Sequence, residues 1–250
     1  MSGNGKVAIV TGGGQGLGQA TATALSTAGF RVAVLGRTLS KLEQTAELCD
    51  GECLPVVCDL VDPEQVRQAF AKVTDAFGRL DVLVNNAASY APFPFAEATD
   101  EQITNLVAQN LTSPMFCARQ AIIEMRKAGG GDIVNISTQS VLTPQPTMIV
   151  YAAAKGGLET FAVGLRNELR GQNIRVLTLQ IGVVAGTTFD DSDVEGQQRY
   201  LDGLANAGLE KAFVFPGSQP ADLADSIVYA LAAPRETVIE DIVVRGFEAP

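Results

Sequence analysis

The feature that most constrains the fold is a regular alternation of apolar, strand-like runs with helix-like segments along nearly the whole chain. The strand-like runs, rich in Val, Ile and Leu, are Lys6–Thr11, Arg31–Gly36, Leu54–Leu60, Asp81–Asn86, Asp132–Ser137, Ile174–Gly182 and Asp241–Arg245. The helix-like segments are Gly16–Ala28, Leu39–Cys49, Pro63–Phe77, Asp100–Lys127, Tyr151–Arg170 and Ala221–Ala232. Apolar strands that alternate with helices are typical of a parallel sheet covered on both faces. We therefore predict an α/β fold with a doubly wound sheet of about seven strands.

No linker or change in composition divides the chain, so we expect a single domain over residues 1–250. Residues 183–217 are the one long interruption of the alternation, and they are rich in Gly, Asp and Gln. In a doubly wound fold the ligand binds at the carboxyl ends of the strands. Because this segment follows directly on a strand, we expect it to be a substrate lid.

The composition excludes several kinds of chemistry. The chain has no histidine, so it has no Ser-His-Asp triad, no Cys-His pair and no histidine-ligated metal. The 18 basic and 28 acidic residues leave a net charge of −10, which argues against nucleic acid and anionic membrane surfaces as partners. No segment approaches the ~18 apolar residues of a membrane span. Acid–base chemistry near neutral pH must therefore use Tyr, Lys, Cys or a carboxylate.

Four cysteines are present, and three of them lie close together, at Cys49, Cys53, Cys58 and Cys117. Their spacing differs from the CxxC of common zinc sites, so we expect free thiols and no metal. Cys58 lies in an apolar run and is expected to point into the core. Because we find neither a secretory signal nor a disulfide framework, we expect a cytoplasmic location.

The first 42 residues contain no Asp or Glu but four basic residues, namely Lys6, Arg31, Arg37 and Lys41. This imbalance indicates a local anion site, or it is a chance fluctuation. Within it, glycines follow the first strand with the spacing G-x-x-x-G-x-G at Gly12, Gly16 and Gly18, which is not the strict G-x-G-x-x-G. Such a turn before a helix brings the backbone and its free N–H groups close to a pyrophosphate.

The end of the second strand reads Leu35-Gly36-Arg37, with no acidic residue before Glu43. An NAD site usually has an acidic residue there, on the ribose 2′-hydroxyl. Arg37 suits a 2′-phosphate, so NADP(H) is favoured. The alternative is that Arg37 is a solvated surface charge and that NAD(H) is also accepted.

Of four tyrosines, only Tyr151 has a lysine four residues later, Lys155. Residues i and i+4 share one face of a helix, and an ammonium beside a phenol lowers the phenol's pKa. A tyrosine tuned in this way exchanges protons with a ketone or alcohol oxygen. The pattern is weak alone, because a half-buried tyrosine near a solvated lysine would look the same.

Taken together and in this order, these motifs resemble the short-chain dehydrogenase/reductase family over nearly the whole chain, which implies a Rossmann-type fold. The motifs are TGGGQGLG at Thr11–Gly18, CDL at Cys58–Leu60, NNAA at Asn85–Ala88, Asn110, NIST at Asn135–Thr138 and YAAAK at Tyr151–Lys155.

The resemblance implies that Tyr151 is the general acid–base, that Lys155 lowers its pKa and holds the nicotinamide ribose, and that Asn110 positions a relay water. It also implies a homotetramer or homodimer. The cofactor-binding residues that it implies are Gly12, Gly14, Gln15, Gly16, Leu17, Gly18, Arg37, Asp59, Leu60, Asn86, Ala87, Tyr151, Lys155, Gly182 and Val184.

The sequence departs from the family pattern in two places. The family's catalytic serine, thirteen residues before the tyrosine, is here Thr138, whose hydroxyl can donate the same hydrogen bond. Ser140 is the rival, expected on the same strand face, while Ser137 should point the other way. After the sixth strand, Ile181-Gly182 replaces the family's Pro-Gly, and Thr187 comes one place late.

Three loops are expected to form the substrate walls: Ser89–Phe95, Val141–Val150, and the stretch from Phe189 to Phe215. Their mostly apolar side chains suit a ketone or secondary alcohol with a hydrophobic body. The candidate substrate residues are Ser140, Tyr90, Met148 and Phe189.

The leading hypothesis is therefore an oxidoreductase that transfers a hydride between NADP(H) and a small-molecule carbonyl or secondary alcohol. A cofactor-binding regulator without turnover is the alternative from another class. Within the family, the alternative is a 3-oxoacyl-carrier-protein reductase, whose acidic carrier would need basic residues near the entrance. The candidates for that surface are Arg126, Lys127, Arg166 and Arg170.

Overall fold

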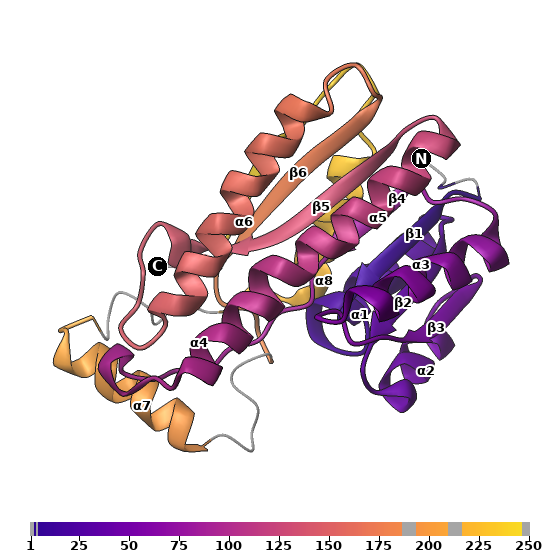
Figure 1. Cartoon of the computed structure of the whole chain (residues 1–250). Coiled ribbons are helices and arrows are strands. Elements are labelled where there is room, and N and C mark those ends of the chain that lie inside the picture. The colour runs from indigo at the N-terminus through magenta and orange to yellow at the C-terminus, as the bar shows by residue number, and fades with distance from the viewer. Residues whose placement is uncertain (1–2, 4, 187–193, 210–216, 247–250) are drawn as a thin grey trace.

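A computed structural model describes residues 3, 5–186, 194–209 and 217–246 of the chain (Figure 1). It contains a seven-stranded sheet with the order β3-β2-β1-β4-β5-β6-β7, in which every paired strand is parallel to its neighbour. The strands are β1 Val7–Thr11, β2 Arg31–Gly36, β3 Cys53–Val57, β4 Val82–Asn85, β5 Gly131–Thr138, β6 Ile174–Ile181 and β7 Asp241–Val244. The predicted α/β class and doubly wound sheet are confirmed.

Helices follow the strands in alternation, as the sequence predicted. They are α1 Gly16–Thr27, α2 Leu39–Glu47, α3 Pro63–Phe77, α4 Asp100–Val107, α5 Ser113–Ala128, α6 Ile149–Glu168, α7 Val194–Asn206 and α8 Pro220–Leu231. Short turns of other helix types are η1 Phe95–Glu97, η2 Ala108–Thr112 and η3 Gln139–Val141. None of the described helices is long and apolar enough to cross a membrane.

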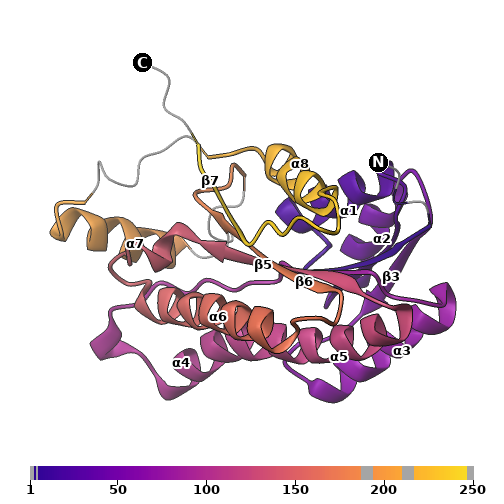
Figure 2. The ribbon, with the colours of Figure 1, turned by 90° about the horizontal axis from the view of Figure 1, so that it is seen from above.

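Two hydrophobic cores lie on opposite faces of the sheet, because successive side chains of a strand point to opposite faces. In β1, Val7 and Ile9 belong to one core, and Ala8 and Val10 to the other. Helices α3, α5 and α6 pack against the first core, and α1, α2 and α8 against the second (Figure 2). This double cover explains why the strands are apolar throughout.

The helix expected over Asp100–Lys127 is interrupted by η2, which has π-helical geometry. Pro114 has no backbone N–H to continue the α-helical pattern. The Ser113 hydroxyl instead donates to the Gln109 carbonyl at 2.9 Å. The proline was the sequence signal for this break, and the sequence reading passed over it.

Helix α7 was also missed, because it lies inside residues 183–217, which were read as an irregular lid. Arg199 in α7 donates to the Pro92 carbonyl at 3.3 Å, and a Cβ on Gly203 would lie 3.1 Å from the Thr147 side chain. The helix therefore packs on the loops that follow β4 and β5. That this segment acts as a lid stays a prediction.

Asp132, at the amino end of β5, joins three parts of the fold. Its Oδ1 accepts from Arg175 Nε at 2.6 Å and from Arg235 Nη1 at 2.8 Å. The side chains of Asp132 and Arg175 are only 12% and 11% exposed. Asp132→Asn leaves a guanidinium without its countercharge. We therefore expect the free energy of unfolding to fall by about 2–3 kcal/mol.

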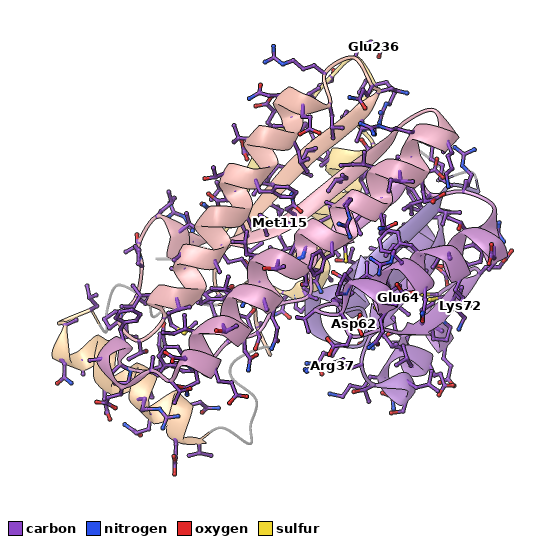
Figure 3. All side chains as sticks on the ribbon, in the orientation of Figure 1. Arg37, Asp62, Glu64, Lys72, Met115 and Glu236 are labelled. Atoms are coloured by element: carbon purple, nitrogen blue, oxygen red, sulfur yellow. The ribbon has the colours of Figure 1, made fainter. Side chains whose placement is uncertain are left out.

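The control is Glu64→Gln, since Glu64 also pairs with an arginine, Arg67, but on the exposed face of α3 (Figure 3). Thermal unfolding should show Asp132→Asn melting roughly 5–10 °C below the parent, with Glu64→Gln nearly unchanged. Equal melting temperatures for all three proteins would contradict a role for this network in stability.

Candidate active site

The glycine turn lies where β1 and β4 are neighbours, the point at which the strand order reverses and doubly wound folds bind ligands. Gly12 has a φ of +64°, and a Cβ there would lie 2.9 Å from the Cα of Ala87. A Cβ on Gly18 would lie 2.1 Å from the Gly12 carbonyl oxygen. Gly12 therefore allows the tight turn after β1, and Gly18 allows α1 to pack closely against it. Gly13 was not singled out, but a Cβ there would lie 2.7 Å from Val34 Cγ1.

Asn86 and Ala87, expected to line the cofactor crevice, are bonded to the end of β1. Asn86 Nδ2 donates to the Thr11 carbonyl at 2.9 Å. The Thr11 hydroxyl oxygen accepts from the backbone N–H groups of Asn86 and Ala87 at 3.0 and 3.1 Å. Thr11 thus joins the two strands at the glycine turn, a role that sequence reasoning missed.

The residues expected at the adenosine end follow β2 and β3. Arg37 comes directly after β2 and is exposed; it points outward on the same edge of the molecule as Asp62 (Figure 3). Lys41 donates to Gln15 Oε1 at 2.7 Å, which places a second cation beside the glycine turn. Asp59 and Leu60 follow β3, where the Asp59 N–H donates to Gln65 Oε1 at 3.0 Å.

Tyr151 is 5% exposed and lies in the first turn of α6, where the side chains of Thr138 and Tyr90 are close enough to its hydroxyl to influence its pKa. The rings of Tyr90 and Tyr151 have centroids 5.1 Å apart. Although 48% of the Tyr90 surface is exposed, burial raises the pKa of its hydroxyl. The site therefore places three hydroxyls together.

Ser140 was expected on the strand with Thr138, but it lies in the turn η3 beyond the end of β5. The Thr138 hydroxyl donates to Ser140 Oγ at 3.2 Å, and Ser140 Oγ donates to Gln145 Oε1 at 3.3 Å. Ser137 points the other way, as predicted, and donates to Glu159 Oε1 at 2.5 Å. Thr138 is therefore the hydroxyl that influences the pKa of Tyr151, and Ser140 is bonded to Thr138.

The expected effect of Lys155 on the pKa of Tyr151 stays a prediction. Burial is the largest influence on Tyr151 and raises its pKa well above 10. Lys155 is 2% exposed, and its ammonium donates to the Ile136 carbonyl at 2.8 Å. Burial also lowers the pKa of Lys155 to about 8. The phenol is thus held in its neutral form, while the pKa of the lysine lies near physiological pH.

Asn110 is fully buried in η2, where its side chain holds the loop after β4. Its Nδ2 donates to the carbonyls of Ser89 and Leu106 at 3.0 and 2.9 Å, and its Oδ1 accepts from the Ser89 N–H at 3.2 Å. Asn110 therefore positions the segment that carries Tyr90. Its expected role with a relay water stays a prediction.

The other expected site residues border the same end of the sheet. Gly182 follows β6, where a Cβ would lie 2.9 Å from Gln139 Oε1, and Val184 forms an isolated parallel bridge with Ser218. Met148 is buried at the start of α6. Phe189 and Thr187 lie outside the described residues.

No cluster of metal-ligating side chains occurs within the part of the chain that the structure describes. The four cysteines are free thiols, as expected. Cys58 is buried in the core, and burial raises its pKa to about 11.

Comparison with known proteins decides the family. The sequence matches the short chain dehydrogenase family over residues 6–198. The chain belongs to this family. As a short-chain dehydrogenase it is an oxidoreductase, with the Rossmann-type fold of its relatives.

Among curated relatives, this short-chain dehydrogenase is 30% identical to dehydrogenase/reductase SDR family member 11 of Gallus gallus, over 98% of the chain and 97% of that protein. It is 27% identical to a metagenomic short-chain oxidoreductase solved with NADP, with a TM-score of 0.80 over 98% and 99% of the two chains. An actinorhodin polyketide ketoreductase variant, solved with NADPH, is also 27% identical, with a TM-score of 0.82 over 98% of each chain.

Proposed function

We propose that the protein interconverts a small-molecule ketone and the corresponding secondary alcohol, with NADP(H) as the cofactor and Tyr151 as the general acid–base. The observation that carries this proposal is the Tyr151 phenol, which is buried at the carboxyl end of the sheet with Thr138 close enough to influence its pKa. Its pKa is raised, so it is protonated and able to donate to a carbonyl oxygen.

In the direction of reduction, the Thr138 hydroxyl donates a hydrogen bond to the carbonyl oxygen and polarises the C=O bond. Bound NADPH supplies the hydride that the carbonyl carbon accepts. The Tyr151 hydroxyl then gives its proton to the oxygen, which completes the alcohol and leaves a phenolate. Lys155, one helical turn away, stabilises the phenolate with its positive charge until a proton returns from solvent.

The preference for NADP(H) over NAD(H) is proposed from two cations, Arg37 after β2 and Lys41 beside the glycine turn. A 2′-phosphate forms charge-assisted hydrogen bonds with such groups. The NADP and NADPH in the titles of two relatives support the same choice.

Arg37→Ala should weaken NADPH binding by about 10–100-fold and leave NADH binding unchanged. In the parent, saturating NADPH at about a hundred times Kd should raise the melting temperature by roughly 5–10 °C, and most of this shift should be lost in the variant. Arg126→Ala is the matched control, because Arg126 lies in the last turn of α5, which leads into the amino end of β5. Equal losses with both cofactors would remove Arg37 from the 2′-phosphate role.

The alternative of a carrier-protein reductase receives less support. Arg166, one of the basic residues considered for carrier binding, is 11% exposed and donates to the Val176 carbonyl and to Asp241. Arg126 and Lys127 lie in the last turn of α5, away from the carboxyl edge of the sheet. A small ketone is therefore the substrate class to screen first with NADPH.

A further inference from the structure

Glu159 lies on helix α6, one turn beyond Lys155 and two turns beyond Tyr151. Tyr151, Lys155 and Glu159 follow one another at intervals of four residues, so they share one face of the helix. The Lys155 ammonium reaches β5, where the Ile136 carbonyl accepts from it at 2.8 Å. Glu159 is partly buried and also faces the sheet, because its Oε1 accepts from the next residue of β5, Ser137, at 2.5 Å.

The same carboxylate oxygen has a second donor on the neighbouring strand. Gln180 Nε2 in β6 donates to Glu159 Oε1 at 3.0 Å. Ser137 and Gln180 are register partners in the sheet, and they are 1% and 7% exposed. Two polar side chains at adjacent positions of a largely apolar sheet thus converge on one acid. This arrangement fixes the carboxylate next to Lys155 and distinguishes it from a solvated acid on a helix surface.

The groups bonded to Lys155 and to Glu159 carry no charge. The Ile136 carbonyl of β5 accepts from Lys155, and the Ser137 hydroxyl of β5 and the Gln180 amide of β6 donate to Glu159. Among the described residues, Glu159 is the one charge that acts on Lys155: burial lowers the lysine's pKa to about 8, and Glu159 opposes this effect.

We propose that Glu159 is a positioning residue of the reaction, whose carboxylate, held by Ser137 and Gln180, keeps the buried Lys155 charged and in place beside Tyr151. This inference rests on the proposed function, because it gives Lys155 its use in stabilising the Tyr151 phenolate. Glu159 itself touches none of the reacting atoms.

The first test measures Lys155 directly and needs no substrate. The chain has six lysines, so the Cε resonance of Lys155 in labelled protein can be assigned with a Lys155→Met variant and titrated by NMR. In Glu159→Gln the Lys155 midpoint should fall by about 0.5–1 pH unit, because a nearby negative charge is lost while the side-chain shape is kept. Glu168→Gln is the matched control, an exposed acid near the end of the same helix.

A Lys155 midpoint in Glu159→Gln equal to that of the parent would overturn the proposal. If Glu159→Gln does not fold, Ser137→Ala replaces it: the carboxylate loses one of its two donors, and a smaller shift in the same direction is expected. An unchanged midpoint in that variant would equally contradict the proposal.

The second test uses turnover. Lys155 is charged only below its pKa, so kcat for ketone reduction should fall as the pH rises through that pKa. In Glu159→Gln this fall should occur at lower pH, by the same interval as the Lys155 midpoint measured by NMR. A purely structural role would lower the melting temperature and leave the pH of this fall unchanged. If the parent turns over no ketone, the proposed function fails, and the NMR result still reports whether Glu159 sets the charge of Lys155.

Discussion

Replacing Tyr151 with phenylalanine should lower kcat for ketone reduction by about 10²–10⁴-fold and leave NADPH binding unchanged. The variant removes one oxygen atom and keeps the buried ring that packs against Tyr90. Thr138 remains to polarise the carbonyl, and its hydroxyl is too weak an acid to supply the proton.

The measurement compares steady-state kcat and the NADPH-induced shift in melting temperature. Tyr229→Phe is the matched control, since Tyr229 is 72% exposed on α8. Both variants should keep the parent's thermal shift with NADPH, and only Tyr151→Phe should lose turnover. If Tyr151→Phe turned over ketone at the parent's rate, Tyr151 would not be the acid, and the mechanism would be wrong.

The topology of the sheet was predictable because each strand carries its own signal. An apolar, β-branched run of four to nine residues indicates a buried strand, and a helix between two such runs forces them to be parallel. The start of α3 was equally clear: Asp62 precedes Pro63, and its carboxylate does accept the Glu64 N–H at 2.8 Å.

Helix α7 and the turn η2, which interrupt the regular alternation of strands and helices, were not predictable in the same way. Helix α7 has many polar residues and only a narrow apolar stripe, and it packs on two loops whose positions depend on the folded sheet. The turn η2 had a signal in Pro114, but the long helical periodicity on both sides of the proline concealed it.

The candidate site could be predicted as a set of residues but not as a network. Spacing alone placed Tyr151 and Lys155 on one helical face. It could not show that the Lys155 ammonium bonds the Ile136 carbonyl, nor that Ser137 and Gln180 meet at Glu159. These contacts join strands and helices that are far apart in sequence, so they depend on the register of β5 and β6.

Gly18→Ala should disrupt both the fold and cofactor binding. The new Cβ would lie 2.1 Å from the Gly12 carbonyl oxygen and 2.6 Å from Asn86 Nδ2. The first of these contacts is with backbone, so helix α1 must move away from the glycine turn to relieve it. We expect a loss of about 3 kcal/mol in stability from this overpacking. Because the N–H groups of α1 are expected to bind the pyrophosphate, moving the helix should lower NADPH affinity about 100-fold.

Gly164 is the matched control, and replacing it with alanine should raise the stability of the protein instead of lowering it. Gly164 lies in α6, and nothing is within 4 Å of the position that its Cβ would take. Gly164→Ala should therefore stabilise the protein by about 0.5–1 kcal/mol, since alanine is the better helix former. Thermal unfolding with and without NADPH separates the two effects in each variant. Parent-like melting and a full NADPH shift in Gly18→Ala would mean that α1 does not need its close contact with Gly12, and the glycine turn would lose its place as the phosphate site.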